Sequence, residues 1–381
     1  MKYKVEKLTS LPNEIKNKLD KDLLDYIDYR KSGLSLNHII GCPLDCSYCI
    51  RHVFNNFQMK KPYFIVSDEV AVKNLLTHKY FIKNLTPLQL FNRATDPFLP
   101  SVKEHTFNVL RLLSEHNLSN TVLLITRYIV TEEDTKKLNE FLPLKVVLLI
   151  TYSGIDDKKI EPINSEIAIK SLKKAYKNSK NYKVILYWRP LIPFINDSDK
   201  HIKKVAILSK HAHATAFTGL FFRKEMFEYY KENNIHIPYK EIARRKILPQ
   251  VLENNIVEKF KKFKGVSLFK KSSCAIAYAY SVSDYNGHYG IRELCDSCDT
   301  NQRRICKNNW IIPKGIDIQM LLDRLNIDID FTVTNRAIVF DKLSEENRYF
   351  IQHNLNYQAH SSENPHYTGS HGRADIGRNR T

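Results

Sequence analysis

The sequence lacks any long hydrophobic run. Its longest apolar stretch lies near residues 144–150, well short of the roughly 20 residues that a membrane-spanning helix needs. The N-terminus, with Lys2, Lys4, Glu6 and Lys7, also lacks the apolar core of a signal peptide. We therefore expect a cytoplasmic protein without a membrane partner.

Cysteine is scarce, at seven in 381 residues, and we find no internal repeat and no long low-complexity tract. The seven cysteines fall into two groups, which suits metal ligands in a reducing compartment better than a secreted disulfide framework. With 43% hydrophobic residues, the chain can build either one large α/β domain with an appendage or two domains.

Acidic residues are too few to balance the basic ones. Asp and Glu number 41 against 59 Lys and Arg, which gives a net charge of +18. Such an excess favours polyanionic partners, nucleic acid first. The lysines are scattered along the chain, however, so a lysine-rich composition spread over solvated faces remains an alternative.

The first cysteine group is the strongest chemical signal. The segment Gly41-Cys42-Pro43-Leu44-Asp45-Cys46-Ser47-Tyr48-Cys49 places three thiols within eight positions. Four thiolates close a structural zinc or iron-sulfur site, whereas three thiolates on a four-iron cluster leave one iron without a protein ligand. A zinc loop that borrows a distant ligand, or a chance cluster, is the alternative.

Strand-like and helix-like segments alternate after this loop. Expected strands cover residues 34–40, 87–92, 121–125, 145–151, 183–188 and 214–222, and expected helices cover 68–76, 101–116, 132–141, 165–177 and 199–211. Nearly continuous apolar strands separated by helices indicate a parallel sheet that is buried on both faces. We therefore predict an α/β fold, a partial (β/α)6 TIM-type barrel over residues 34–223.

In such a barrel, catalytic residues come from the carboxyl ends of the strands and the loops that follow. Each expected strand end carries a polar group. These are residues 92–97 after the second strand, Thr126 and Arg127 after the third, 151–154 after the fourth, Arg189 after the fifth and Thr218 at the sixth.

The second cysteine group comprises Cys274, Cys295, Cys298 and Cys306. A Cys-x2-Cys pair such as Cys295 and Cys298 can present two sulfurs to one ion from a tight turn. Three interpretations stay open: an auxiliary iron-sulfur cluster, a structural zinc, or unligated thiols of which one donates a hydrogen atom. Arg303 and Arg304 lie nearby, where they would offset thiolate charge or face a phosphate.

The remaining segments define the expected organisation. We expect a helical lead-in over residues 1–33, a basic helical linker or cap over 224–273 that includes Arg244, Arg245 and Lys246, and a cysteine-rich auxiliary segment over 274–311. A small α+β module over 312–359 should contain helices at 316–325 and 344–354 and strands at 331–333 and 337–340. The tail, 360–381, carries His360, His366, His371 and Arg373; either it binds phosphate or substrate, or it is frayed.

Cys-x3-Cys-x2-Cys with an aromatic residue before the last cysteine resembles the signature of the radical S-adenosylmethionine superfamily. Within it, the chain is similar to the spore photoproduct lyase-like branch. The residues that carry this resemblance are the cysteine loop, Thr95-Asp96-Pro97, and Arg189-Pro190 with Pro193, within a region of about residues 35–223. The resemblance implies a [4Fe-4S] cluster on Cys42, Cys46 and Cys49 that cleaves S-adenosylmethionine to methionine and a 5′-deoxyadenosyl radical.

The resemblance also implies roles for the strand-end residues. Ala94, Thr95 and Asp96 would hold the amino group of S-adenosylmethionine, Ser153 would face its ribose or carboxylate, and Arg189 would grip its carboxylate. Tyr48 would supply backbone contacts to the adenine. A carboxylate and a hydroxyl suit an ammonium group, and arginine can form a fork with a carboxylate. For each residue, a strand-end capping role is the alternative.

The chain departs from that branch, because no cysteine lies between Cys49 and Cys274 to act as a hydrogen donor, and the second cysteine group and the His-rich tail also lie outside its pattern. We therefore expect a related activity on DNA or RNA, repair or base modification, rather than thymine-dimer repair itself. An electron donor such as a flavodoxin or ferredoxin is an implied partner. A peptide or small-metabolite substrate, or a non-catalytic iron-sulfur sensor that binds nucleic acid, are the alternatives. The sequence leaves the catalytic residues and the oligomeric state unassigned.

Overall fold

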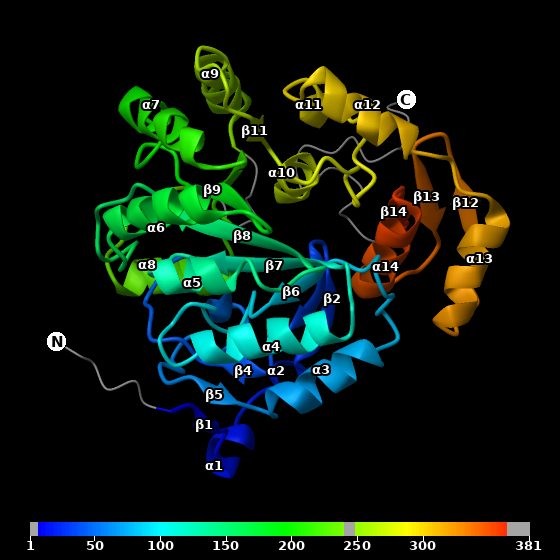
Figure 1. The fold of residues 1–381 in the computed structure, drawn as a ribbon, viewed down its shortest axis with the longest axis horizontal. Helices are drawn as coiled ribbons and strands as arrows, with labels where there is room; N and C mark the ends of the chain where they lie inside the picture. The colour runs from blue at the N-terminus through cyan, green and yellow to red at the C-terminus, as the bar shows by residue number, and fades with distance from the viewer. Residues whose placement is uncertain (1–6, 240–247, 364–381) are drawn as a thin grey trace.

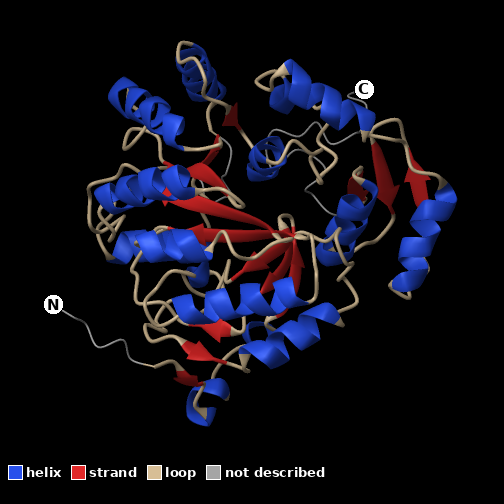
Figure 2. Ribbon diagram, viewed as in Figure 1, coloured by secondary structure: helices blue, strands red, loops and turns tan. Residues whose placement is uncertain are grey.

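The computed structural model describes residues 7–239 and 248–363. Within them, a central sheet of eight strands has the order β11-β10-β9-β8-β7-β6-β3-β2 (Figures 1 and 2). Its strands are β2 (Ile27–Arg30), β3 (Gly33–Leu36), β6 (Leu88–Leu90), β7 (Thr121–Thr126), β8 (Lys145–Tyr152), β9 (Lys183–Leu191), β10 (Ala214–Gly219) and β11 (Leu268–Phe269). Within this central sheet, β2 and β3 pair antiparallel and all other neighbouring strands pair parallel. The fold is a mixed α/β architecture with a large parallel sheet.

Helices follow the parallel strands and cover the outer face of the sheet (Figure 1). They are α3 (Asp68–Leu76), α4 (Lys103–Glu115), α5 (Glu132–Lys137), α6 (Ser165–Asn178) and α7 (Asp199–Leu208), which a 3-10 turn at Ser209–His211 extends. In contrast, α8 (Lys224–Glu232) packs with Cys46 and Tyr48 of the cysteine loop. Along β8, Val146 and Leu148 join the core beneath these helices, whereas Val147 and Leu149 join the core on the inner face. Burial on both faces explains why the strands read as nearly continuous apolar runs.

The inner face is covered by residues that follow the sixth parallel strand. After α9 (Gln250–Lys261) and β11, the chain forms α10 (Ser272–Ala279), α11 (Arg292–Cys295) and α12 (Thr300–Asn308). Ala275 and Ile276 of α10 pack against Leu149 and Ile185 of the central strands. The second cysteine group therefore sits on the concave side of the sheet.

The N-terminal segment differs from the expected helical lead-in. It forms β1 (Thr9–Ser10), the short helices α1 (Asn13–Lys16) and α2 (Lys21–Leu24), and strand β2. A small sheet joins β1 to β5 (Tyr63–Phe64) and β4 (Ile39–Ile40). The helical expectation was wrong for residues 27–30, which form β2 and pair with β3. Ile27 and Tyr29 of this strand are buried, and the residues that alternate with them are half-buried.

The C-terminal residues form α13 (Gly315–Arg324), α14 (Glu345–Leu355) and a sheet of β12 (Phe331–Val333), β13 (Ala337–Phe340) and β14 (Gln358–Ser361). The sequence missed β14, which pairs with β13 and includes His360. Helix α14 packs against β2, where the hydroxyl of Tyr29 lies 2.9 Å from Nδ1 of His353. The hydrophobic core runs without a break into this module, so the domain boundaries stay predictions.

The strands and helices expected between residues 68 and 219 are confirmed, with shifts of a few residues at their ends. The predicted roles of Arg244, Arg245 and Lys246, and of His366, His371 and Arg373, fall outside the described residues. Among the helices that the structure describes, none combines the length and apolar character needed to cross a bilayer.

Candidate metal loop and adjoining cavity

The cysteine loop leaves strand β4 through Gly41. This residue has a φ of +101°, and a Cβ atom built on it would lie 2.2 Å from the carbonyl oxygen of Lys61. The backbone on either side is anchored, since the Gly41 amide donates to the oxygen of Ala94 at 3.2 Å and the Cys42 amide donates to the oxygen of Met59 at 2.9 Å. Only glycine fits this conformation and this close approach.

Arg51 holds the loop from inside. It lies in the 3-10 turn Ile50–His52, directly after the last cysteine of the motif, and only 1% of it is exposed. Its guanidinium donates to the backbone oxygens of Cys42 and Phe57 at 2.6 and 2.5 Å. A buried arginine therefore closes the loop and places a positive charge beside its thiols.

Cys42 and Cys46 are buried, and Cys49 is half-buried. Burial raises the pKa of Cys42 to about 11, although the charge of Arg51 opposes this shift. Burial also raises the pKa of Cys46, against the charge of Arg127. These thiols therefore stay protonated at neutral pH in the free protein, and a metal must displace their protons to bind. Nearby cations suit the negative charge of a thiolate cluster.

The residues after β6 reach the same place. Ala94 is buried beside Ile40 and accepts the Gly41 amide through its backbone, so it helps to hold the loop. The hydroxyl oxygen of Thr95 is buried and has no hydrogen-bond partner among the residues that the structure describes. A buried polar atom without a partner is costly unless a ligand satisfies it. Thr95 therefore fits the predicted contact with the amino group of S-adenosylmethionine.

Asp96 is tied to the end of β7. One of its carboxylate oxygens accepts from the hydroxyl of Thr126 at 2.7 Å and from the amide of Phe98 at 2.9 Å, and the other accepts from the amide of Arg127 at 3.0 Å. Burial raises its pKa, while these donors oppose the shift. Asp96 thus caps a strand end, and a contact with an ammonium group would have to share oxygens already in use.

Tyr48, Arg127 and Glu161 form a buried cluster beneath the loop. The Tyr48 hydroxyl donates to a carboxylate oxygen of Glu161 and accepts from Nη1 of Arg127, which also pairs with Glu161 at 3.1 Å. Burial raises the pKa of Tyr48. The cluster holds the aromatic residue of the motif at the wall of the cavity.

Ser153 and Arg189 have different surroundings. The Ser153 hydroxyl accepts from the amide of Ile155 at 3.2 Å in a local turn, and the serine does not line the main cavity. Arg189 lines the cavity, and its guanidinium lies 4.9 Å from the centre of the Tyr187 ring. Tyr48 and Arg189 are therefore the two predicted cofactor-binding residues that line the cavity.

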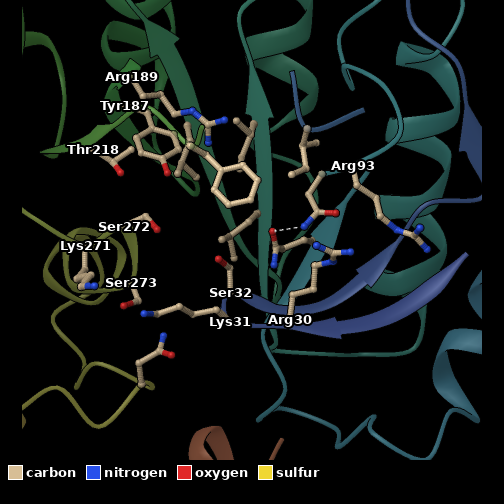
Figure 3. Close-up of a pocket in the computed structure, with 18 of the residues that line it drawn as sticks. Arg30, Lys31, Ser32, Arg93, Tyr187, Arg189, Thr218, Lys271, Ser272 and Ser273 are labelled. Atoms are coloured by element: carbon tan, nitrogen blue, oxygen red, sulfur yellow. Dashed lines mark hydrogen bonds between the residues drawn. The ribbon is translucent and has the colours of Figure 1, made fainter. Parts of the chain in front are cut away.

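The cavity lies on the concave side of the sheet and has a volume of about 400 Å³. Figure 3 shows Arg189, Tyr187 and Thr218 on one wall, Lys31 and Ser32 on another, and Ser272 and Ser273 between them. Strand side chains such as Leu123 and Leu149 make its apolar floor. Its charged lining comprises the cations Arg30, Lys31, Arg93, Arg189, Lys270 and Lys271 and the carboxylates Asp28, Glu345 and Glu346.

Several residues of this region belong to no recognisable motif, so their place at the site was not predicted. Glu161 lies in an irregular segment without a motif, and Lys31 and Ser32 belong to the segment that was expected to be a lead-in helix. Gln89 sits in the middle of β6, where its side chain faces the cavity and its Nε2 has no hydrogen-bond partner. Arg127 could be found from its place at the end of a strand.

Comparison with solved structures identifies the fold. The chain is similar to spore photoproduct lyase complexed with dinucleoside spore photoproduct, with a TM-score of 0.50 and 10% identity over 64% of this chain and 78% of that one. The two chains therefore share a fold. A spore photoproduct lyase variant with bound AdoMet and the same dinucleoside matches at a TM-score of 0.49 and 11% identity, over the same shares of the two chains.

Streptococcus suis SuiB bound to S-adenosylmethionine also matches. It has a TM-score of 0.42 and 10% identity, over 74% of this chain and 60% of that one. No protein-family model and no curated protein matches the sequence. The similarity to spore photoproduct lyase is therefore a similarity of fold.

Proposed function

We propose that this chain is a radical S-adenosylmethionine enzyme that acts on a nucleic-acid substrate. The observation that carries the proposal is the cysteine loop, which leaves β4 and is held by Gly41 and Arg51, with Tyr48 at the wall of the cavity. Cys42, Cys46 and Cys49 would hold a [4Fe-4S] cluster with one iron free of protein ligands. When bound and reduced by an electron donor, such a cluster would supply the one electron needed to cleave S-adenosylmethionine to methionine and a 5′-deoxyadenosyl radical.

The spacing of the three sulfurs favours a cluster over a single zinc. Tetrahedral zinc with Zn–S bonds of about 2.3 Å requires sulfurs about 3.8 Å apart. Within the described residues, the one set of three potential ligands whose atoms all lie within 4.8 Å of one another contains none of these cysteines. Their wider spacing suits thiolates at separate corners of a four-iron cluster.

Thr95 and Arg189 would orient S-adenosylmethionine by binding its polar groups. The unpartnered hydroxyl of Thr95 offers a hydrogen bond to the ammonium group, and the guanidinium of Arg189 offers a charge-assisted fork to the carboxylate. Ala94 and Asp96 would act mainly by fixing the loop and the strand end. Tyr48, braced by Arg127 and Glu161, would close the side next to the adenine.

The cavity supports a substrate that carries both an apolar, planar part and phosphate. Its strand side chains can pack against a base, and the amide of Gln89 has a free donor that could meet a base edge. Lys31 and the serines at positions 32, 272 and 273 are groups that commonly bind phosphate oxygens. A target base in a duplex would have to be flipped out to enter.

Arg30 and Arg93 are partly neutralised, because both pair with Asp28. The lining nevertheless has six cationic side chains and three carboxylates. A peptide or small metabolite would use the same cavity without contacting an extended basic surface. A non-catalytic iron-sulfur sensor would bind nucleic acid without cleaving S-adenosylmethionine. An electron donor such as a flavodoxin or ferredoxin is part of the proposal.

The experiment is reductive cleavage under anaerobic conditions. Reconstituted protein is mixed with S-adenosylmethionine and dithionite, and 5′-deoxyadenosine is measured by chromatography. We expect its formation, and we expect none from the Cys42→Ala/Cys46→Ala/Cys49→Ala variant. A protein that holds iron but produces no 5′-deoxyadenosine would favour the sensor.

The substrate class is tested separately by binding to single-stranded and duplex DNA and RNA at several salt concentrations. Nucleic-acid affinity should fall steeply as salt rises, because cations on the protein release counterions from phosphates. Active protein that shows no such binding would favour a peptide or metabolite substrate.

A further inference from the structure

The four remaining cysteines lie on the concave side of the sheet. Three of them come from different helices, and the fourth lies in a turn. Cys274 lies in the first turn of α10, Cys295 ends α11, and Cys306 lies near the end of α12. Cys298 follows Cys295 in a tight turn, since its amide donates to the Cys295 oxygen at 3.1 Å. The fold thus brings together thiols that lie up to 32 positions apart in the sequence.

His288 lies between two of these sulfurs. The Cys274 sulfur is 3.8 Å from Nδ1 of His288, and the Cys295 sulfur donates to the His288 carbonyl oxygen at 3.7 Å. Asp284 accepts from the amide of His288 at 3.2 Å and pairs with its ring nitrogen at 2.9 Å. Potential ligand atoms of Cys274, Asp284 and His288 all lie within 4.8 Å of one another.

The other two sulfurs approach the same place. Gln302 places Nε2 3.4 Å from the sulfur of Cys306, and the same nitrogen donates to the Val282 oxygen at 2.8 Å. Cys274 and Cys298 both pack against the inner-face core. The contacts of all four cysteines therefore place them around His288, Gln302 and the inner-face core.

We propose that Cys274, Cys295, Cys298 and Cys306 bind a second iron-sulfur cluster, with His288 and Asp284 packed beside it. A single zinc would draw four sulfurs to within about 3.8 Å of one another. Within the described residues, the set of converging ligand atoms includes only one of these sulfurs. Four thiolates can occupy the four corners of a [4Fe-4S] cluster.

The location of this site suggests what the second cluster does. His288 lines the cavity, and so does Ser273, the residue before Cys274. With four protein thiolates, no iron is left free for the sulfonium cofactor. The second cluster would therefore fix α10, α11 and α12 as the cavity wall that faces the sheet. The charge of Arg303, which acts on Cys295 and Cys298, would offset part of the negative charge of the site.

The test counts metal in a protein without the first site. The Cys42→Ala/Cys46→Ala/Cys49→Ala variant is reconstituted anaerobically with iron and sulfide, and iron, sulfide and zinc are measured per chain. We expect about four irons with matching sulfide. Adding Cys295→Ala and Cys298→Ala should remove this iron. Ser297→Ala, between the two cysteines, is the matched control and should retain it.

A first-site variant that contains no iron, or zinc in its place, would overturn the proposal. So would iron that survives the added Cys295→Ala and Cys298→Ala changes. If that combined variant fails to fold, as judged by circular dichroism, Cys306→Ser in the same background repeats the test with one ligand removed. In an otherwise wild-type chain, Cys295→Ala/Cys298→Ala should still form 5′-deoxyadenosine, so loss of the second cluster is distinguishable from failure of the proposed reaction.

Discussion

Arg51 donates from Nη1 to the backbone oxygen of Cys42 at 2.6 Å, nine positions earlier in the chain. Its second terminal nitrogen binds the oxygen of Phe57. A buried guanidinium that binds two carbonyl oxygens links the start of the cysteine loop to the segment that follows it. The shape of the loop is therefore set by the polypeptide before any metal binds.

Replacing Arg51 by Met should loosen the loop. Two buried carbonyl oxygens would lose their charged donor, and we expect a loss of about 2–4 kcal/mol in unfolding free energy. Iron retention should fall as well, because the thiols would no longer be held in place. Denaturant unfolding and iron analysis on anaerobic protein measure both effects. Unchanged iron binding would show that the cluster, rather than Arg51, shapes the loop.

Gly41→Ala should be more damaging than an ordinary glycine substitution. The added Cβ would meet the Lys61 oxygen at 2.2 Å in a backbone conformation with φ of +101°. We expect a cost of about 1–3 kcal/mol from backbone strain, plus the displacement of the loop. Gly315→Ala is the matched control: nothing lies within 4 Å of its Cβ position, and it sits at the start of α13. Equal effects of the two variants on iron content and unfolding would refute the steric argument.

Arg189→Ala should weaken binding of S-adenosylmethionine. Removing a charge-assisted hydrogen bond costs about 1.5–3 kcal/mol, which corresponds to about a tenfold to hundredfold rise in Kd. Calorimetry on the reconstituted protein measures this change. Arg111→Ala, at an exposed position on α4, is the control and should bind normally. If Kd is unchanged while nucleic-acid binding falls, Arg189 contacts the substrate instead.

Asp68 should make stability depend on pH. Burial would raise its pKa, but hydrogen bonds from His105, His38 and Asn108 outweigh this effect and hold the pKa well below its usual range. A carboxyl group with a depressed pKa in the folded state stabilises the protein above its unfolded pKa, and this stability is lost as the pH falls. The unfolding free energy of the wild type should therefore decrease below about pH 4.

His105 contributes in the opposite direction. Its hydrogen bond to Asp68 raises its pKa, so its stabilisation is present at low pH and is lost as the pH rises through the raised value. Asp68→Asn should reduce both changes, as measured by denaturant unfolding across a pH series. Asp330→Asn, at an exposed position, should behave like the wild type. A variant profile that matches the wild type would exclude Asp68 as the cause.

The sequence predicted the sheet well because its signals are local. Residues 145–151 and 183–188 read as strands, since strands buried on both faces are apolar throughout, and β8 and β9 form there. The cysteine loop was found from spacing alone. Thr95 and Arg189 stay predicted cofactor contacts; they were chosen because polar residues at strand ends gather at one edge of a parallel sheet and because the resemblance implies these roles.

What the sequence could not predict depends on contacts between distant residues. Glu161 becomes important only when the fold brings it to Tyr48 and Arg127. The segment that contains Tyr29 reads as helical in isolation, yet it forms an edge strand because α14 covers it. His288 and Asp284 carry no motif, and their closeness to Cys274 follows only from the turn between α10 and α11.

The packing of α14 against β2 has a consequence for the order in which the protein folds during synthesis. Tyr29, on the strand that edges the sheet, contacts His353 and Phe350, which are synthesised more than 300 residues later. Until α14 has been synthesised, this flank of the sheet has no cover. The concave cavity next to it should therefore be completed only once α14 has folded against β2, and iron delivered before then would meet an incomplete site.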